Sequence, residues 1–400
     1  MSVIVLDTMG SDHGVEVLVK GACDLSLESN DIQTILVGPS KQIQMLLQQY
    51  HHDPSKLELE EALSAVSMDA NPRNIPEDSS LFRALQLVKN HKNAALVSAG
   101  NTGAVIVGAS RTFDRLEGIK KAALAAVYPT EKKHGPRGDP FALMLDVGAT
   151  LHVDAEELVA FALMGSVYAQ IISDNPRPKI ALLSNGSEAN KGAPEVVQAH
   201  RILKSIPSLN FMGNVEGLDI PKGTADVIVC EGFLGNVALK MIEGVGEVAS
   251  ALIKDASEQN LIWRLGIGML YQGIQQLKAL TDWKQYGGAP ILGLNRVVIK
   301  AHGRSNARAI RNAIKLANKA LASLPTILRM APIGPAFHVF LHSSAAAIFG
   351  SLDFLMIVMI ASIFAIATIR PSTIWPLSLA FLSSNFVLLV TTSFLCLINS

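Results

Sequence analysis

The chain has 400 residues, and its 34 lysine and arginine residues balance 34 aspartate and glutamate residues. Without a net charge there is no overall field of the kind that attracts nucleic acid, so no nucleic-acid partner is expected. The ten histidines are scattered, and the three cysteines (Cys23, Cys230 and Cys396) are widely spaced. This usage indicates neither a metal cluster nor a disulfide framework, and it fits a reducing compartment.

Charge is distributed unevenly along the chain. Residues 331–400 contain one acid, Asp353, and one base, Arg370. Removing one of each sign from 34 leaves 33 of each in residues 1–330. The sequence therefore divides into a charged body, long enough for a large α/β domain, and an apolar tail.

The N-terminal residues read as a strand followed by a polar turn. Residues 3–6 are aliphatic and end at Asp7, with no basic region before them, so a first strand is expected rather than a signal peptide. Ligands of open α/β sheets lie at the carboxyl ends of strands, which makes Asp7 and Asp12 site candidates. Asp12 alone is better explained as the cap of the helix that follows.

The next elements alternate between strand and helix up to a glycine-rich turn. The expected elements are a strand at 34–37, a helix at 41–50, a short strand within 57–66, a polar loop at 69–78, a helix at 81–90 capped by Ser79 or Ser80, and a strand at 94–97.

The glycine-rich turn, residues 98–104, leads from the strand at 94–97 into a helix. Backbone N–H groups at a helix N-terminus attract anions, so Gly100, Asn101, Thr102 and Gly103 form a candidate phosphate cradle. An ordinary turn capped by Asn101 or Thr102 explains the same pattern. The stretch alone leaves both interpretations open.

The second half repeats the alternation. Strands are expected at 122–127, 142–145, 180–183, 211–215 and 226–230, with a polar loop at 131–139 and a helix starting at Asp154. Gly165 within that helix indicates close packing. The pattern predicts an α/β fold: a doubly wound, largely parallel sheet with helices on both faces.

Common catalytic motifs are absent from the sequence. It contains no GxGxxG after the first strand, no Walker motif, no GxSxG and no HExxH. Cys230 lies in an apolar strand, which favours an inert buried thiol. Lys191 stands in a strand-end loop beside Gly192, where it could hold an oxyanion, although spacing alone favours a solvated lysine.

Taken together, a set of short segments resembles the bacterial phosphate acyltransferase of phospholipid synthesis. The segments are residues 7–12, 98–104, 146–149, 163–168, 191–192, 213–217, 231–237, 286–290 and 300–303. The resemblance covers residues 2–325. It implies a fold similar to phosphotransacetylases and isocitrate-dehydrogenase-like enzymes, a homodimer, and no cofactor or metal.

The resemblance also implies a reaction, in which acyl-acyl-carrier-protein and inorganic phosphate give acyl phosphate and free acyl carrier protein. The product would feed phosphatidic acid synthesis, with a glycerol-phosphate acyltransferase as a further partner. Phosphate is itself the nucleophile, so no catalytic serine or cysteine is needed. The turn at Gly100–Gly103 would bind phosphate. The expected catalytic residues are Lys191 and Asn236 for charge and oxyanion stabilisation, and Asp7, Asp12 and His302 for orientation or proton handling.

Two regions point towards a membrane. In the resembled family, residues 255–285 correspond to a projecting helical hairpin whose apolar tip, here Trp263, Leu265 and Leu270, contacts membrane, although a buried core helix would look the same. The chain would then be cytoplasmic, on the inner face of the cell membrane. The tail, 326–400, holds uncharged runs at 354–369 and 374–398. A transmembrane hairpin and a sequence artefact remain equally open there, and the protein would be integral only if the tail is genuine.

Two other functions remain compatible with the sequence. One is a phosphotransacetylase-like enzyme that uses acyl-CoA. The other is a non-catalytic, membrane-tethered scaffold, suggested by departures from the family pattern: Ser11 replaces a glycine, and Glu77 and Asp78 stand where the family often has basic residues.

Overall fold

The computed structural model describes residues 1–136, 138–259, 266, 268–270, 272–273 and 287–330. Of the expected membrane contacts, Leu270 is described, whereas Trp263 and Leu265 lie outside the described residues. The expected hairpin at 255–285 is described only in part, and the tail at 331–400 also lies outside.

The first part of the chain follows the predicted alternation closely. Its elements are β1 (Ser2–Asp7), α1 (Gly14–Glu28), β2 (Ile32–Gly38), α2 (Ser40–Gln49), the 3-10 helix η1 (Pro54–Lys56), β3 (Leu57–Glu61), α3 (Ser80–Asn90), β4 (Ala94–Ser98) and α4 (Thr102–Thr112). Ser79 caps α3, because its side chain accepts a hydrogen bond from the Phe82 N–H. The predicted cap and the predicted short strand within 57–66 are therefore confirmed.

The second part contains one departure from expectation. Its elements are β5 (Ala123–His134), β6 (Asp139–Leu145), α5 (Ala155–Ile172), β7 (Lys179–Leu183), α6 (Pro194–Lys204), β8 (Asn210–Val215), α7 (Asp219–Lys222), β9 (Val227–Val229), α8 (Gly232–Gln259), β10 (Ala289–Leu292), β11 (Val297–Lys300) and α10 (Ala307–Met330). The predicted loop at 131–139 is wrong, since β5 continues to His134 and forms an antiparallel hairpin with β6.

The strands of the described residues form one sheet of eleven, in the order β3-β2-β1-β4-β11-β10-β5-β6-β9-β7-β8. Neighbours are parallel from β3 to β11 and again from β6 to β8. The pairs β11–β10, β10–β5 and β5–β6 are antiparallel. The sheet is therefore largely parallel, as predicted, but it consists of two parallel blocks joined by antiparallel strands.

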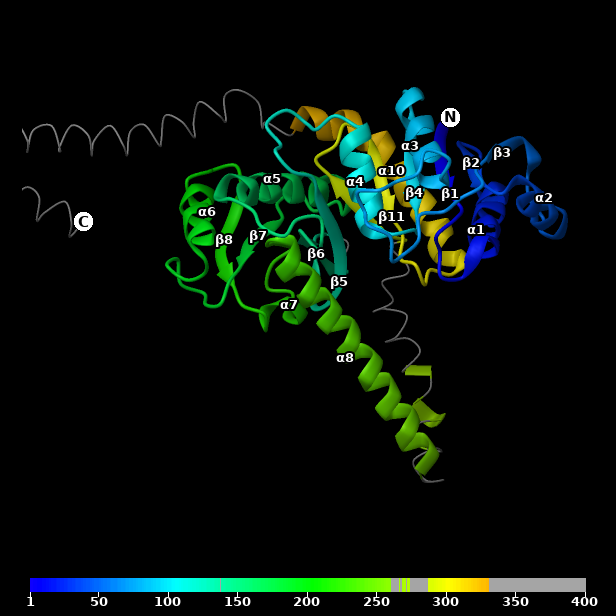
Figure 1. Cartoon of the computed structure of the whole chain (residues 1–400). Helices are drawn as coiled ribbons and strands as arrows, with labels where there is room; N and C mark the ends of the chain where they lie inside the picture. Colours follow the sequence, from blue (N-terminus) through cyan, green and yellow to red (C-terminus); the bar gives the residue numbers. More distant parts are fainter. Residues whose placement is uncertain (137, 260–265, 267, 271, 274–286, 331–400) are drawn as a thin grey trace, which may run out of the picture. The chain divides into compact units, whose positions relative to one another are not determined.

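Helices cover both faces of the sheet (Figure 1). One face buries residues of α3 and α4 together with the first turns of α8. The other face buries α1 and α10 over the first block, and α5 and α6 over the second. This arrangement confirms the predicted doubly covered sheet.

Helix α5 packs very closely on β9. A Cβ added at Gly165 would lie 2.7 Å from Val227 Cγ1, which explains the glycine at this position. Among the described residues, α5 is the one helix long and apolar enough to cross a membrane, yet 78% of that window is buried inside the protein. Its apolar composition is accounted for by core packing.

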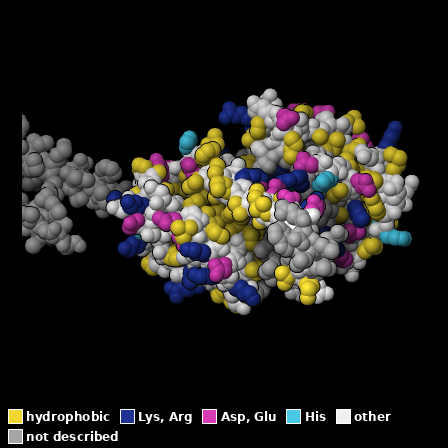
Figure 2. Space-filling view, turned by 90° about the horizontal axis from the view of Figure 1, so that it is seen from below, with side chains coloured by type: hydrophobic (Ala, Val, Ile, Leu, Met, Phe, Trp, Pro, Cys, Tyr) yellow, Lys and Arg dark blue, Asp and Glu magenta, His cyan; other side chains and the backbone are white. Residues whose placement is uncertain are grey.

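Helix α8 differs from the others because most of its length lacks a packing partner among the described residues. Ala238, Leu239 and Ile242 pack on the core, whereas Met241 and Leu252 are 65% and 63% exposed. Figure 1 shows its second half extending beyond the sheet. The space-filling view from below shows hydrophobic side chains gathered beside basic and acidic ones on this side of the protein (Figure 2).

Candidate functional site

Three polar residues lie side by side where neighbouring strands end. Asp7, Ser98 and Lys300 are the last residues of β1, β4 and β11, and the strand register pairs Asp7 with Ser98 and Ser98 with Lys300. Side chains in register on parallel strands point to the same face of a sheet. Here it is the face covered by α3 and α4, because residues two positions earlier in each strand belong to that core.

Asp7 is buried and held by several hydrogen bonds. Its Oδ1 accepts from Ser80 Oγ at 2.6 Å and its Oδ2 accepts from Ser98 Oγ at 2.7 Å. The Met9 N–H adds a bond of 3.2 Å to Oδ1. Burial raises the pKa of Asp7, while these hydrogen bonds and the charge of Lys300 oppose the rise. The geometry suits an orienting carboxylate better than a mobile base.

Lys300 is the main residue that the sequence reasoning missed. Its side chain is buried, and burial lowers its pKa to about 8, against the opposing effect of the carboxylates of Asp7 and Asp12. Its Nζ donates to the carbonyl oxygen of Ala301. The sequence does contain an indication of this role, because Lys300 directly follows three β-branched strand residues. A charged side chain is costly to bury at such a position unless a counter-charge or hydrogen bonds compensate for it.

Asn101 has a structural role in the glycine-rich turn. Its side-chain oxygen caps α4 by accepting from the Ala104 N–H at 3.0 Å, which confirms the capping interpretation. Its amide group donates to the carbonyl oxygens of Ser67 and Met68 at 3.1 Å and 2.8 Å. Asn101 thus holds the loop that contains Pro72 against the start of α4.

The glycines and Thr102 of this turn have different surroundings. Gly100 lies so close to Gly10 that a Cβ added at Gly10 would be 2.9 Å from the Gly100 Cα. A Cβ on Gly103 would lie 2.7 Å from Pro72 Cγ, so the loop leaves no space there. Thr102, the first residue of α4, is exposed. Phosphate binding by the turn stays a prediction.

Asp12 and His302 lie beside the row of strand ends. The N-cap of α1 is His13, without a side-chain hydrogen bond, so the predicted capping role of Asp12 is wrong. Instead the Asp12 N–H donates to the carbonyl oxygen of Gly303 at 3.0 Å, joining the turns after β1 and β11. His302 Nδ1 accepts from the Arg304 N–H at 3.1 Å. Burial lowers the pKa of His302.

Helix α8 brings charged groups to the same place. The charge of Lys240 acts on both Lys300 and His302, and that of Glu243 acts on His302. Further along the helix, Glu247 Oε1 forms an ion pair with Arg304 Nη1 at 3.4 Å. The turn after β11 therefore reaches the side of α8, although that helix begins in the other parallel block.

Lys191 and Asn236 belong to that second block. Lys191 is exposed in the loop after β7, where its N–H donates to the Glu188 carbonyl oxygen at 3.0 Å. Asn236 is exposed near the start of α8. Over the described part of the chain, no hydrogen bond or ion pair joins either side chain to Asp7 or Lys300. The structure groups Asp7, Asp12, His302 and the glycine-rich turn, whereas Asn236 lies one helical turn before Lys240 on α8, and the roles of Lys191 and Asn236 stay predictions.

Asp146 fixes the start of α8, a role that the sequence reasoning did not assign. Its buried carboxylate accepts from the N–H groups of Leu124, Ala149 and Thr150 at 2.8 to 3.0 Å, from Gly148 at 3.1 Å, and from the Thr150 hydroxyl at 2.9 Å. Burial raises its pKa against these bonds. A Cβ on Gly235 would lie 1.9 Å from the Asp146 carbonyl oxygen, so this turn and α8 are in direct contact.

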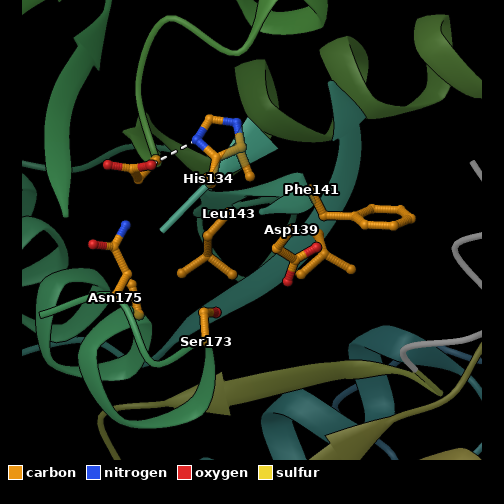
Figure 3. A pocket seen from close by; sticks show the side chains of 10 residues that line it. His134, Asp139, Phe141, Leu143, Ser173 and Asn175 are labelled. Atoms are coloured by element: carbon orange, nitrogen blue, oxygen red, sulfur yellow. Dashed lines mark hydrogen bonds and ion pairs between the residues drawn. The ribbon is translucent and has the colours of Figure 1, made fainter. Parts of the chain in front are cut away.

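A small cavity beside the β5–β6 hairpin is the second polar cluster. Figure 3 shows His134 on one side of it and Ser173 and Asn175 on the other. His134 Nδ1 bonds Asp226 Oδ1 at 2.6 Å, and Asp226 also accepts from the Lys179 N–H. These contacts tie the hairpin to the start of β9. Nowhere in the described residues do three His, Cys, Asp or Glu side chains form a metal-binding group.

Sequence comparison finds close relatives over most of the chain. A family model described as fatty acid synthesis protein matches residues 2–326. A phosphate acyltransferase of Dictyoglomus turgidum is 42% identical over 320 residues, which cover 79% of this chain and 93% of that protein. A phosphate acyltransferase of Campylobacter jejuni is 40% identical over 317 residues, covering 78% and 92%.

Structure comparison finds likenesses among solved enzymes. A phosphotransacetylase from Streptococcus pyogenes superposes with a TM-score of 0.54 at 18% identity, covering 81% of this chain and 94% of that one. A second phosphotransacetylase, from Staphylococcus aureus, gives 0.51 at 15% identity, covering 80% and 94%. At such low identity the likeness concerns the fold alone, and it confirms the predicted α/β architecture.

Proposed function

Because the chain belongs to the fatty acid synthesis protein family and is an acyltransferase that uses phosphate, we propose that its acyl donor is an acyl-acyl-carrier-protein and that its acyl phosphate product feeds phospholipid synthesis. Family membership confirms the resemblance seen in the sequence motifs. It also sets aside the non-catalytic scaffold, since the curated relatives are enzymes by name.

The observation that carries the proposal is the row of strand ends on the face of α3 and α4. Asp7, Ser98 and Lys300 place a buried ammonium group near the start of two helices, where backbone dipoles favour an anion. A phosphate ion supplies the negative charge and the acceptor oxygens that the ammonium group of Lys300 and the N–H groups at the helix starts can bind.

The chemistry needs no nucleophile from the protein. A phosphate oxygen attacks the thioester carbonyl carbon, the C–S bond breaks, and the carrier thiolate leaves and takes up a proton. The two described cysteines fit this scheme, because burial raises the pKa of Cys23 to about 11 and also raises that of Cys230. Both thiols therefore stay protonated and are poor nucleophiles near neutral pH.

The remaining roles follow from chemistry and position. The backbone of Gly100–Gly103 would hold phosphate, with Thr102 as an exposed hydroxyl at its edge. Lys191 and Asn236 would stabilise the tetrahedral oxyanion. Asp7 and Asp12 would orient the site. His302 would accept the proton of the attacking hydrogen phosphate and pass it to the leaving thiolate, and burial lowers its pKa.

The test is a comparison of two acyl donors with the full chain. We expect phosphate-dependent release of free carrier protein from acyl-acyl-carrier-protein, with a kcat/KM well above that for acyl-CoA of the same chain length. The opposite ranking would favour the phosphotransacetylase-like alternative. If neither donor is consumed when phosphate is added, the proposed reaction is wrong.

Location and partners are part of the same proposal. We propose a cytoplasmic homodimer at the inner face of the cell membrane, which passes acyl phosphate to a glycerol-phosphate acyltransferase. The support lies in exposed apolar residues of α8 and beyond it, including Met241, Val245, Leu252 and Leu270 at 63 to 65% exposure. Apolar surface of this kind favours a partner chain or a lipid surface.

A further inference from the structure

We propose that Lys300 binds the phosphate substrate directly, as the buried cation of the site. The assignment rests on the proposed function, because it names the side chain that would hold the attacking anion. It differs from the expectation drawn from the sequence, which gave the charge of the site to Lys191.

The hydrogen bonds of Lys300 leave room for such a ligand. An ammonium group has three N–H donors. Within the described part of the chain, Nζ has a single acceptor, the carbonyl oxygen of Ala301, and no carboxylate lies within ion-pair distance. Asp7 is nearby, but its two oxygens already accept from the hydroxyls of Ser80 and Ser98.

Burial makes this arrangement expensive without an anion. Lys300 is 6% exposed, and a buried charge is costly unless a counter-charge and hydrogen bonds compensate for it. The phosphate dianion supplies both. The buried position of Lys300 costs free energy, but it leaves two strong N–H donors free to bind the substrate.

A second cation converges on the same place from a different element. Lys240 of α8 interacts with Lys300 as a like charge, which adds to the effect of burial on the Lys300 pKa. Like charges that approach each other without a ligand repel, and an anion between them removes the repulsion. The helix N-termini of α3 and α4 favour negative charge in the same region.

The surroundings also predict how phosphate affinity depends on pH. The groups whose charges act on Lys300 are Asp7 of β1, Asp12 of the following turn and Lys240 of α8, and His302 neighbours it along the chain. With a pKa of about 8, Lys300 is an ammonium group below this pH and becomes neutral above it. Phosphate affinity should therefore fall as the pH rises through about 8, while phosphate itself remains a dianion.

The experiment measures binding of inorganic phosphate to the full chain without an acyl donor, by isothermal titration, and then steady-state kinetics. We expect Lys300→Met to weaken phosphate binding about tenfold or more, which is the effect of losing a charge-assisted hydrogen bond. The KM for phosphate should rise similarly, and the KM for the acyl donor should change little. Lys89→Met, at the far end of α3, is the matched control.

A second variant separates charge from structure. Lys300→Arg keeps a positive charge at every accessible pH, so its phosphate affinity should stay level from about pH 8 to about pH 9.5, where phosphate is a dianion, while that of the wild type falls. Circular dichroism establishes whether each variant folds. If Lys300→Met does not fold, the wild-type pH profile decides, and a level profile overturns the proposal.

The outcomes distinguish this inference from the proposed function. Normal phosphate affinity in a folded Lys300→Met protein overturns the role of Lys300, whatever the acyl donor proves to be. Phosphate binding that depends on Lys300, without turnover of any acyl donor, supports Lys300 and counts against the proposed reaction alone.

Discussion

Asp7 and Lys300 are buried groups of opposite charge that do not form a direct ion pair. The carboxylate oxygens of Asp7 accept hydrogen bonds from Ser80 and Ser98. Asp7 acts on Lys300 only through the charge of its carboxylate. The carboxylate therefore keeps the lysine protonated without competing for its N–H donors. The site can therefore hold the Lys300 cation with free N–H donors before phosphate binds.

Replacing Asp7 with asparagine should lower the pKa of Lys300. Loss of the carboxylate removes the main interaction that raises it, so Lys300 becomes neutral below its present pKa of about 8. Phosphate titrations at a series of pH values should then show affinity falling at a lower pH than in the wild type. Asp53→Asn, at the N-cap of η1, serves as control, and an unchanged profile in Asp7→Asn would contradict the coupling.

Asn101→Ala should destabilise the protein. It removes the cap of α4 and two contacts to the 67–68 backbone, a loss of about 2–3 kcal/mol in the free energy of unfolding. Urea denaturation provides the measurement. Asn101→Asp keeps the capping oxygen but loses the donors, so its stability should lie between those of the wild type and Asn101→Ala. Equal stability of all three proteins would show that the cap contributes nothing.

At this scale the sequence revealed local roles better than distant ones. The Asn101 cap was foreseeable because capping depends on neighbours in sequence. The pairing of Asp7 with Ser80 and Ser98 joins side chains 73 and 91 positions apart. Lys300 was missed for the same reason, since its burial depends on β4 and β10 lying on either side of β11.

Among the elements, α8 depends on a contact with a turn from another strand. Gly235→Ala should prevent α8 from docking, because its Cβ would overlap the Asp146 carbonyl oxygen, a backbone atom that cannot rotate away. We expect a loss of about 3 kcal/mol or more in the free energy of unfolding. Differential scanning calorimetry measures it.

The same helix provides the matched control. Gly244 has no atom within 4 Å of an added Cβ, so Gly244→Ala should keep the fold and gain up to about 1 kcal/mol from helix propensity. If both substitutions had the same effect, the contact between Gly235 and Asp146 would not be what holds α8.

Apolar periodicity predicted most strands and helices, since parallel strands buried on both faces read as continuous apolar runs. It failed at the end of β5, where residues 131–134 are polar but belong to the strand, and His134 pairs with Asp139 of β6. Backbone hydrogen bonds hold this hairpin, and they do not depend on the pattern of apolar side chains along the sequence. The reversal of direction at β10 and β5 was hidden for the same reason.

For the whole molecule, the location proposal predicts that the full chain floats with phospholipid vesicles in a density gradient. Trp263→Glu combined with Leu270→Glu should abolish flotation if the 255–285 region makes the contact, because charge at an apolar contact is costly to bury in lipid. Lys254→Glu, on an exposed part of α8, is the control for charge alone. Flotation that survives the double change and ends when residues 331–400 are removed would assign the membrane contact to the tail.

The position of β11 in the sheet has a consequence for the order in which the protein is made. β11 lies between β4 and β10, yet it follows every other strand in the described part of the chain. During synthesis, β1 to β4 emerge first, and the edge of β4 waits unpaired while the whole second block is translated. The ribosome must pass residue 300 before Lys300 can take its place beside Ser98. The enzyme therefore cannot bind its substrate in the proposed way until β11 has emerged.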